Sequence, residues 1–163
     1  MIDEIYSLAE KHYKLSNEIA KMLYEMSSVI RNKFEKIRFP TMITLRIDFG
    51  ETVEFKHISS EGEVITKKVS RARVVLDNRT YGREGANIKI TLMRGGKEEQ
   101  TINIGVNTTN YDAINIAVNR ELINKILSKV KETLEERIEN QNKLIEEIRK
   151  FLNENPELVA EKI

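Results

Sequence analysis

Basic side chains gather in one stretch of this chain, between residues 67 and 97. The stretch holds nine lysines and arginines and two acids, a net charge of +7, and its one tyrosine lies between two arginines in a glycine-containing loop. Basic groups with an interleaved aromatic ring can hold phosphates and stack on a base. The candidate polyanion-binding residues are Lys67, Lys68, Arg71, Arg73, Arg79, Tyr81, Arg83, Lys89, Arg94 and Lys97.

The same charges have a second interpretation. Arg71 and Arg73 occupy alternate positions of an expected strand, with Lys67 in phase, so we expect them to share one face of a sheet. A solvated face of this kind would also dock the acidic helix of another subunit. Because the signal is compositional and carries no motif, nucleic-acid binding is the alternative function and not the first.

The other reactive groups form no catalytic pattern. The chain has no cysteine, which excludes disulfides, thiolate metal sites and cysteine nucleophiles. His12 and His57 each stand alone, without a second histidine at ligand spacing. Phosphate-binding glycine loops, dinucleotide fingerprints and nucleophile elbows are absent from the sequence. We therefore expect a protein that is not an enzyme and has no catalytic residue, cofactor or metal ligand.

The centre of the chain alternates apolar and polar residues with a period of two, which is typical of half-buried strands. We expect a β domain over residues 41–106 with five or six strands, mostly antiparallel because their connections are short. Gly50 and residues 59–62 are expected turns, and residues 77–86 an expected loop. Residues 94–97 carry two glycines and predict a tight hairpin.

Both ends of the chain carry helical apolar stripes. Residues 2–38 contain neither proline nor glycine, and their apolar positions recur at steps of three and four. Pro40 ends this helix, because the residue before a proline is disfavoured in the helical region. Thr109, three residues before Asp112, has the spacing of a capping box and predicts the start of the second helix.

The two stripes match when they are paired in opposite directions with residue numbers that sum to about 153. Leu15 then faces Ile138, and a polar layer pairs His12 with Gln141. This pairing predicts an α+β fold in which long N- and C-terminal helices form an antiparallel, coiled-coil-like stalk beside the β domain. The expected divisions are the N-terminal stalk helix (1–38), the β domain (41–106), the C-terminal stalk helix (110–154) and a short tail (155–163).

The stripes are wider than a pair of helices requires, since a two-stranded coil uses two positions in seven. The extra apolar positions form a candidate oligomer surface: Met22, Val29, Phe34, Leu144 and Phe151. A homodimer or higher homo-oligomer that forms a helical bundle would cover them. The sequence therefore favours a structural or assembly module that self-associates through the stalk and presents its β domain to a protein partner.

Bulk composition limits the setting. The 163 residues suit one domain with a helical extension, and the formal net charge of +1 argues against a polybasic protein. We see neither an apolar run of about 18 residues nor a secretory signal, so we expect no membrane span and a cytoplasmic protein.

Overall fold

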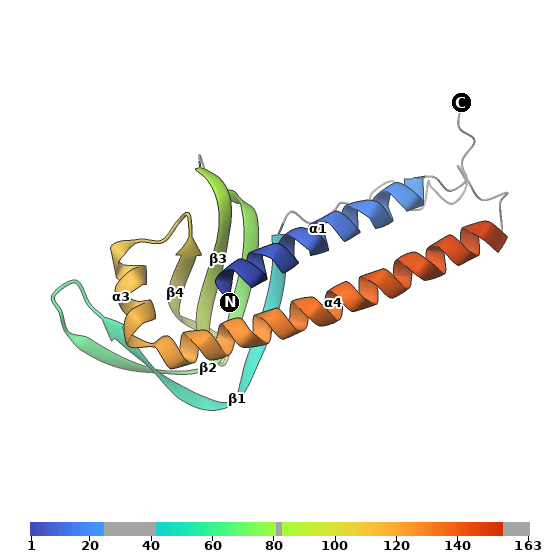
Figure 1. Ribbon diagram of the computed structural model, residues 1–163. Helices are drawn as coiled ribbons and strands as arrows, with labels where there is room; N and C mark the ends of the chain where they lie inside the picture. Colours follow the sequence, from blue (N-terminus) through green and yellow to red (C-terminus); the bar gives the residue numbers. More distant parts are fainter. Residues whose placement is uncertain (25–41, 81–82, 155–163) are drawn as a thin grey trace. The chain divides into compact units, whose positions relative to one another are not determined.

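The computed structural model describes residues 1–24, 42–80 and 83–154. It confirms an α+β fold with helices at both ends and an antiparallel sheet between them (Figure 1). The elements are α1 (Ile2–Tyr24), β1 (Met42–Ile58), β2 (Val64–Thr80), β3 (Arg83–Arg94), β4 (Lys97–Gly105), α3 (Asn110–Val118) and α4 (Arg120–Glu154).

The chain divides into two compact units. The β unit comprises Met1–Tyr6 and Thr41–Thr133, and the helical unit comprises Ser7–Pro40 and Leu134–Ile163. The β unit thus holds the whole sheet, α3, the first turn of α1 and the start of α4. The helical unit holds the remaining described parts of α1 and α4.

The sheet has four strands among the described residues, in the order β1-β2-β3-β4, and not the expected five or six. Two long strands account for the difference. Gly50, at a φ of 73°, does not turn the chain back, and β1 continues through a register shift between Asp48 and Val53. The Asp48 carboxylate accepts a hydrogen bond from the Gly50 amide at 2.8 Å, which fixes this irregularity.

The expected loop over residues 77–86 is also largely wrong, because β2 runs on to Thr80 and β3 begins at Arg83. The hairpin predicted at residues 94–97 is confirmed as the turn between β3 and β4. Gly95 occupies a φ of 59°, which a residue with a side chain rarely adopts.

One face of the sheet forms the core of the β unit. One row of cross-strand partners runs over all four strands of this sheet: Leu45, Val74, Ile90 and Ile102. All four side chains are at most 1% exposed. Burial of such residues stabilises the fold by about 1.5–3 kcal/mol each before the entropic cost of ordering is counted.

The predicted antiparallel stalk is contradicted by the contacts within each unit. In the β unit, Glu4 forms an ion pair with Lys131. In the helical unit, Gln141 Nε2 donates to Ser16 Oγ at 3.1 Å, and Arg149 pairs with Glu18 at 2.6 Å. In the helical unit, residue numbers in α1 and α4 increase together in these pairs, so the two helices run parallel there, and a register in which the numbers sum to 153 is wrong.

The error has a simple physical cause. Steps of three and four residues look almost the same when they are read forwards or backwards, so a stripe does not encode the direction of its partner. The start of α1 is fixed instead by the sheet, where the Tyr6 hydroxyl donates to the Ile104 carbonyl at 2.8 Å. Residues 25–38 of the expected N-terminal helix and the tail at 155–163 lie outside the described residues.

Candidate interaction surface on helix α3

The expected C-terminal helix is divided into α3 and α4, which meet at Asn119. The start of α3 follows the prediction. Thr109 Oγ1 accepts from the Asp112 amide at 3.1 Å, and Asp112 Oδ2 accepts from the Thr109 amide at 2.9 Å, which completes a capping box. This cap fixes where α3 begins.

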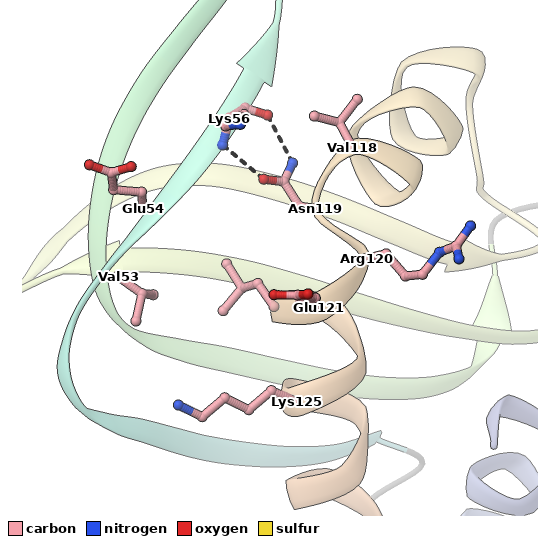
Figure 2. A pocket seen from close by; sticks show the side chains of 9 residues that line it. Val53, Glu54, Lys56, Val118, Asn119, Arg120, Glu121 and Lys125 are labelled. Carbon is pink, nitrogen blue, oxygen red and sulfur yellow. Dashed lines mark hydrogen bonds between the residues drawn. The ribbon is translucent and has the colours of Figure 1, made fainter.

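The face of α3 that turns inward is polar. Asn115 and Asn119 are 2% and 7% exposed. Asn115 Oδ1 accepts from the Ile58 amide at 3.0 Å. Asn119 Oδ1 accepts from the Lys56 amide at 2.8 Å, and Asn119 Nδ2 donates to the Lys56 carbonyl at 2.8 Å (Figure 2).

These asparagines take the place of a neighbouring strand. β1 is an edge strand, and its outer row of amides and carbonyls would otherwise be open to another chain. The amide of Asn119 meets Lys56 with one donor and one acceptor, as a paired strand would. Further along the same strand, the Lys129 ammonium donates to the Asp48 carbonyl at 3.1 Å. The helices α3 and α4 therefore cover the edge of β1 with polar side chains.

The outward face of α3 is apolar. Tyr111, Ile114 and Val118 are 51%, 45% and 44% exposed, and their spacing of three and four residues places them on one side of the helix. Ala113 and Ala117 are also exposed. We call these five residues the α3 surface. It carries no charge, although a third of the residues in the chain are charged.

More exposed apolar side chains lie at the end of the β1–β2 hairpin. Val64 and Ile65 are 60% and 45% exposed, and Val64 is the cross-strand partner of Ile58, which is bonded to Asn115. The β unit thus exposes large apolar side chains both on α3 and on the hairpin to which α3 is attached. Singly exposed apolar residues are ordinary, but three large apolar side chains on one side of α3 are typical of an interaction site.

A pocket of about 520 Å³ lies at the C-terminal end of α3. It opens between β1 and the first turns of α4, and Figure 2 shows Arg120 extending away from Lys56 and Glu54. Its lining residues are Val53, Glu54, Lys56, Val118, Asn119, Arg120, Glu121, Leu122 and Lys125. With three basic and two acidic side chains, this end of α3 is mixed in charge and weakly positive.

The predicted polyanion-binding residues are only partly brought together. Arg71 and Arg73 lie on the solvated face, where Arg73 pairs with Glu98 at 2.7 Å. Lys67 does not share this face. It lies opposite the buried Phe55, and its ammonium donates to the Glu99 carbonyl at 2.8 Å.

Lys67 lies on the other face because the alternation of buried and exposed residues changes phase within β2. Val69 and Ala72 are three residues apart and both are buried, so the alternation of the strand changes between them, beside the register shift in β1. Lys68, Lys89, Arg94 and Lys97 are exposed on the strands and at the β3–β4 turn. The side chains of Arg79 and Arg83, and the whole of Tyr81, lie outside the described part of the chain.

The predicted pairing of His12 with Gln141 is not found in the helical unit. Gln141 bonds to Ser16, one turn beyond His12. Burial of His12 lowers its pKa, and the nearby charge of Arg137 lowers it further. Among the described side chains, three atoms are buried without a hydrogen-bond partner: His12 Nδ1 and Gln141 Oε1 in the helical unit, and His57 Nδ1 in the β unit.

Of the predicted oligomer surface, two residues can be placed. Leu144 and Phe151 are each 44% exposed and, seven residues apart, lie on one side of α4. The side chain of Met22 and all of Val29 and Phe34 fall outside the described residues.

Comparisons with protein-family models, with curated proteins and with solved structures found no match to this chain. Within the described ranges, none of the helices combines the length and the apolar character needed to cross a bilayer. The case for a function therefore depends on the geometry of the chain itself.

Proposed function

We propose that this protein is a non-enzymatic interaction module whose β unit presents the α3 surface to a protein partner. The observation that carries the proposal is the reversed polarity of α3. Its asparagines are buried while Tyr111, Ile114 and Val118 face solvent. A helix in a soluble domain ordinarily turns its apolar stripe inward, so an outward stripe indicates that something else covers it.

The composition of α3 supports the same proposal. Charged residues are depleted at the centres of protein interfaces, whereas aromatic residues are enriched there. The α3 surface fits both trends, with Tyr111 as its aromatic residue and no charge. The rim at its C-terminal end is polar, as expected for the border of an interface.

Self-association through the helical unit, as expected from the sequence, is the competing proposal for the interface. Leu144 and Phe151 offer one exposed apolar line on α4, narrower than the α3 surface. A homo-oligomer built on this line would leave the β unit available to its own partner. An experiment can distinguish the two interfaces by introducing a charged residue into each of them in turn.

Polyanion binding remains the alternative function, and one observation favours it. Arg46 lies directly opposite Arg73 in the β1–β2 register and, with Arg71, gives the solvated face three arginines, of which Arg73 is paired with Glu98. This alternative predicts binding to nucleic acid that weakens steeply with added salt and is lost when Arg46 and Arg71 are changed to Glu. Binding that survives both changes would exclude this face.

A photo-crosslinking residue at Ala113 tests the proposed function whatever the identity of the partner. The matched control places the same residue at Glu132, an exposed position on α4 in the same unit. We expect an adduct of one defined mass from Ala113, formed in the cell that produces the protein, repeated with the purified components, and abolished by Ile114→Glu. No adduct at Ala113, or equal adducts at both positions, would contradict the proposal.

A further inference from the structure

We propose that the partner of the α3 surface is a second copy of this chain, with two α3 helices packed antiparallel across a two-fold axis. This inference rests on the proposed function and identifies the occupant of the same surface. Symmetric dimers are the commonest soluble oligomers, and their interfaces must be complementary to themselves. The α3 surface meets that requirement in both shape and charge.

The shape is self-complementary because large and small side chains share the surface. Tyr111, Ile114 and Val118 project from one line, while Ala113 and Ala117 leave room beside it. In an antiparallel pair, the large residues of each copy can pack over the alanines of the other, since ridges on one helix fill grooves on its neighbour. The absence of charge removes any repulsion at the centre.

The charges at the two ends of α3 differ in sign. Asn119 bonds to Lys56 and Asn115 bonds to Ile58, so β1 runs antiparallel to α3. Lys56 and Ile58 are two residues apart, about 6.6 Å along a strand, and Asn119 and Asn115 are four residues apart, about 6 Å along a helix. Strand and helix therefore advance by the same distance between the two contacts. The turn at the tip of the hairpin therefore reaches the level of the N-terminal end of α3.

That tip is acidic, with Glu61 and Glu63 both exposed and no basic residue in the turn. The other end of α3 carries the exposed bases Lys56 and Arg120 and is weakly positive overall. The two ends lie about 14 Å apart, the length of a nine-residue helix.

An antiparallel arrangement brings each acidic tip to the basic end of the other copy. A parallel arrangement would instead place acid against acid and base against base. The charge pattern thus selects a two-fold axis across α3, and it explains why the occupant is a second copy and not an arbitrary apolar peptide. The helix dipoles also oppose each other in this arrangement, which is favourable.

Sedimentation equilibrium of the full chain tests the inference. We expect the wild-type protein to be a dimer at micromolar concentrations. Ile114→Glu should weaken dimerisation at least about a hundredfold, because it places two charges in the centre of an apolar interface. Leu144→Glu, a matched change at an equally exposed residue of α4, should leave the dimer intact. Unchanged helical circular dichroism shows that each variant is folded.

Charge reversal provides the sharper test. Arg120→Glu alone, and Glu61→Lys with Glu63→Lys, should each weaken the homodimer about tenfold. An equimolar mixture of the two variants should recover wild-type affinity as a heterodimer, because both ends then pair opposite charges. Failure of the mixture to recover affinity would overturn the antiparallel dimer.

The remaining outcomes are also decisive. A wild-type chain that stays monomeric at hundreds of micromolar, or a dimer that is lost with Leu144→Glu and kept with Ile114→Glu, would overturn this inference. In either case, an Ala113 adduct to a different protein would leave the proposed function standing. If Ala113 forms no adduct at all, both proposals fail.

Discussion

Two successive helices of the β unit, α3 and the start of α4, bury opposite kinds of side chain. On α4, Ile123, Ile126 and Val130 are buried, and Lys125 between them is exposed. On α3, Asn115 and Asn119 are buried and the apolar residues face solvent. The hydrophobic effect orients α4, whereas the unpaired edge of β1 orients α3.

The difference teaches that an exposed strand edge can decide which way a short helix faces. A buried backbone amide or carbonyl without a partner costs about 1–3 kcal/mol, comparable to the gain from burying one large apolar side chain. Asn119 alone satisfies both groups of Lys56. For a helix of nine residues, a few such bonds are therefore comparable in energy to the burial of three apolar side chains.

The largest expected effect comes from truncating matched isoleucines on the two helices. Ile126→Ala should lower the free energy of unfolding by about 3 kcal/mol, because it leaves a cavity at a fully buried position. Ile114→Ala should change it by less than about 0.5 kcal/mol in the monomer, because that side chain is already solvated. Urea denaturation of both variants at low protein concentration checks the comparison, and equal losses would contradict it.

The asparagines provide the converse experiment. Asn119→Leu should cost about 2 kcal/mol, because it removes the two hydrogen bonds to the backbone of Lys56 and the one from Nδ2 to the Asn115 carbonyl. Asn124→Leu, at an exposed asparagine of α4, is the matched control and should cost less than about 0.5 kcal/mol. If Asn119→Leu stabilises the fold, hydrogen bonding to the strand edge does not orient α3.

Much of α3 could be predicted from the sequence, but its orientation could not. Thr109 and Asp112 identified the start of the helix, because a capping box is a local interaction. Asn115 and Asn119 gave no signal of their own, since their partners belong to a strand some sixty residues earlier. The low charge of α3, one charged residue in nine, indicates that its solvent-facing side is unusual. It does not indicate which side of the helix is buried.

The sheet and the helical pair show the same division between local and distant information. Alternation predicted the strands well, but Gly50 was expected to be a turn because a glycine beside acidic and polar residues resembles one. The direction of α1 relative to α4 depends on contacts such as that of Gln141 with Ser16, which a symmetric stripe does not specify.

The cap of α3 has a smaller expected effect. Thr109→Ala should lower the unfolding free energy by about 1 kcal/mol, because the Asp112 amide loses its acceptor. Thr109→Ser keeps the hydroxyl and should retain most of the stability. Equal losses in both variants, measured by thermal or urea denaturation, would show that the methyl group and not the cap matters.

The smallest effect concerns the helical unit and its buried histidine. The pKa of His12 lies below its ordinary value of 6.5 in the folded chain, so below pH 6.5 the unfolded chain binds more protons than the folded one. The stability contributed by neutral His12 is therefore complete above about pH 6.5 and falls as the pH decreases towards the lowered pKa. Urea midpoints at about pH 7.5 and about pH 5.5 should show this loss in the wild type and less of it in His12→Gln; an identical loss in both would exclude His12 as its source.

The most direct test compares the solvent accessibility of the two exposed apolar lines as the protein concentration rises. The chain has no cysteine, so Ala113→Cys and Leu144→Cys each provide a single thiol whose rate of alkylation can be measured. We predict that Ala113→Cys is alkylated more slowly at high protein concentration while the rate for Leu144→Cys stays constant. A constant rate for Ala113→Cys, or protection of Leu144→Cys alone, would contradict the assignment of the α3 surface as the interface between two copies.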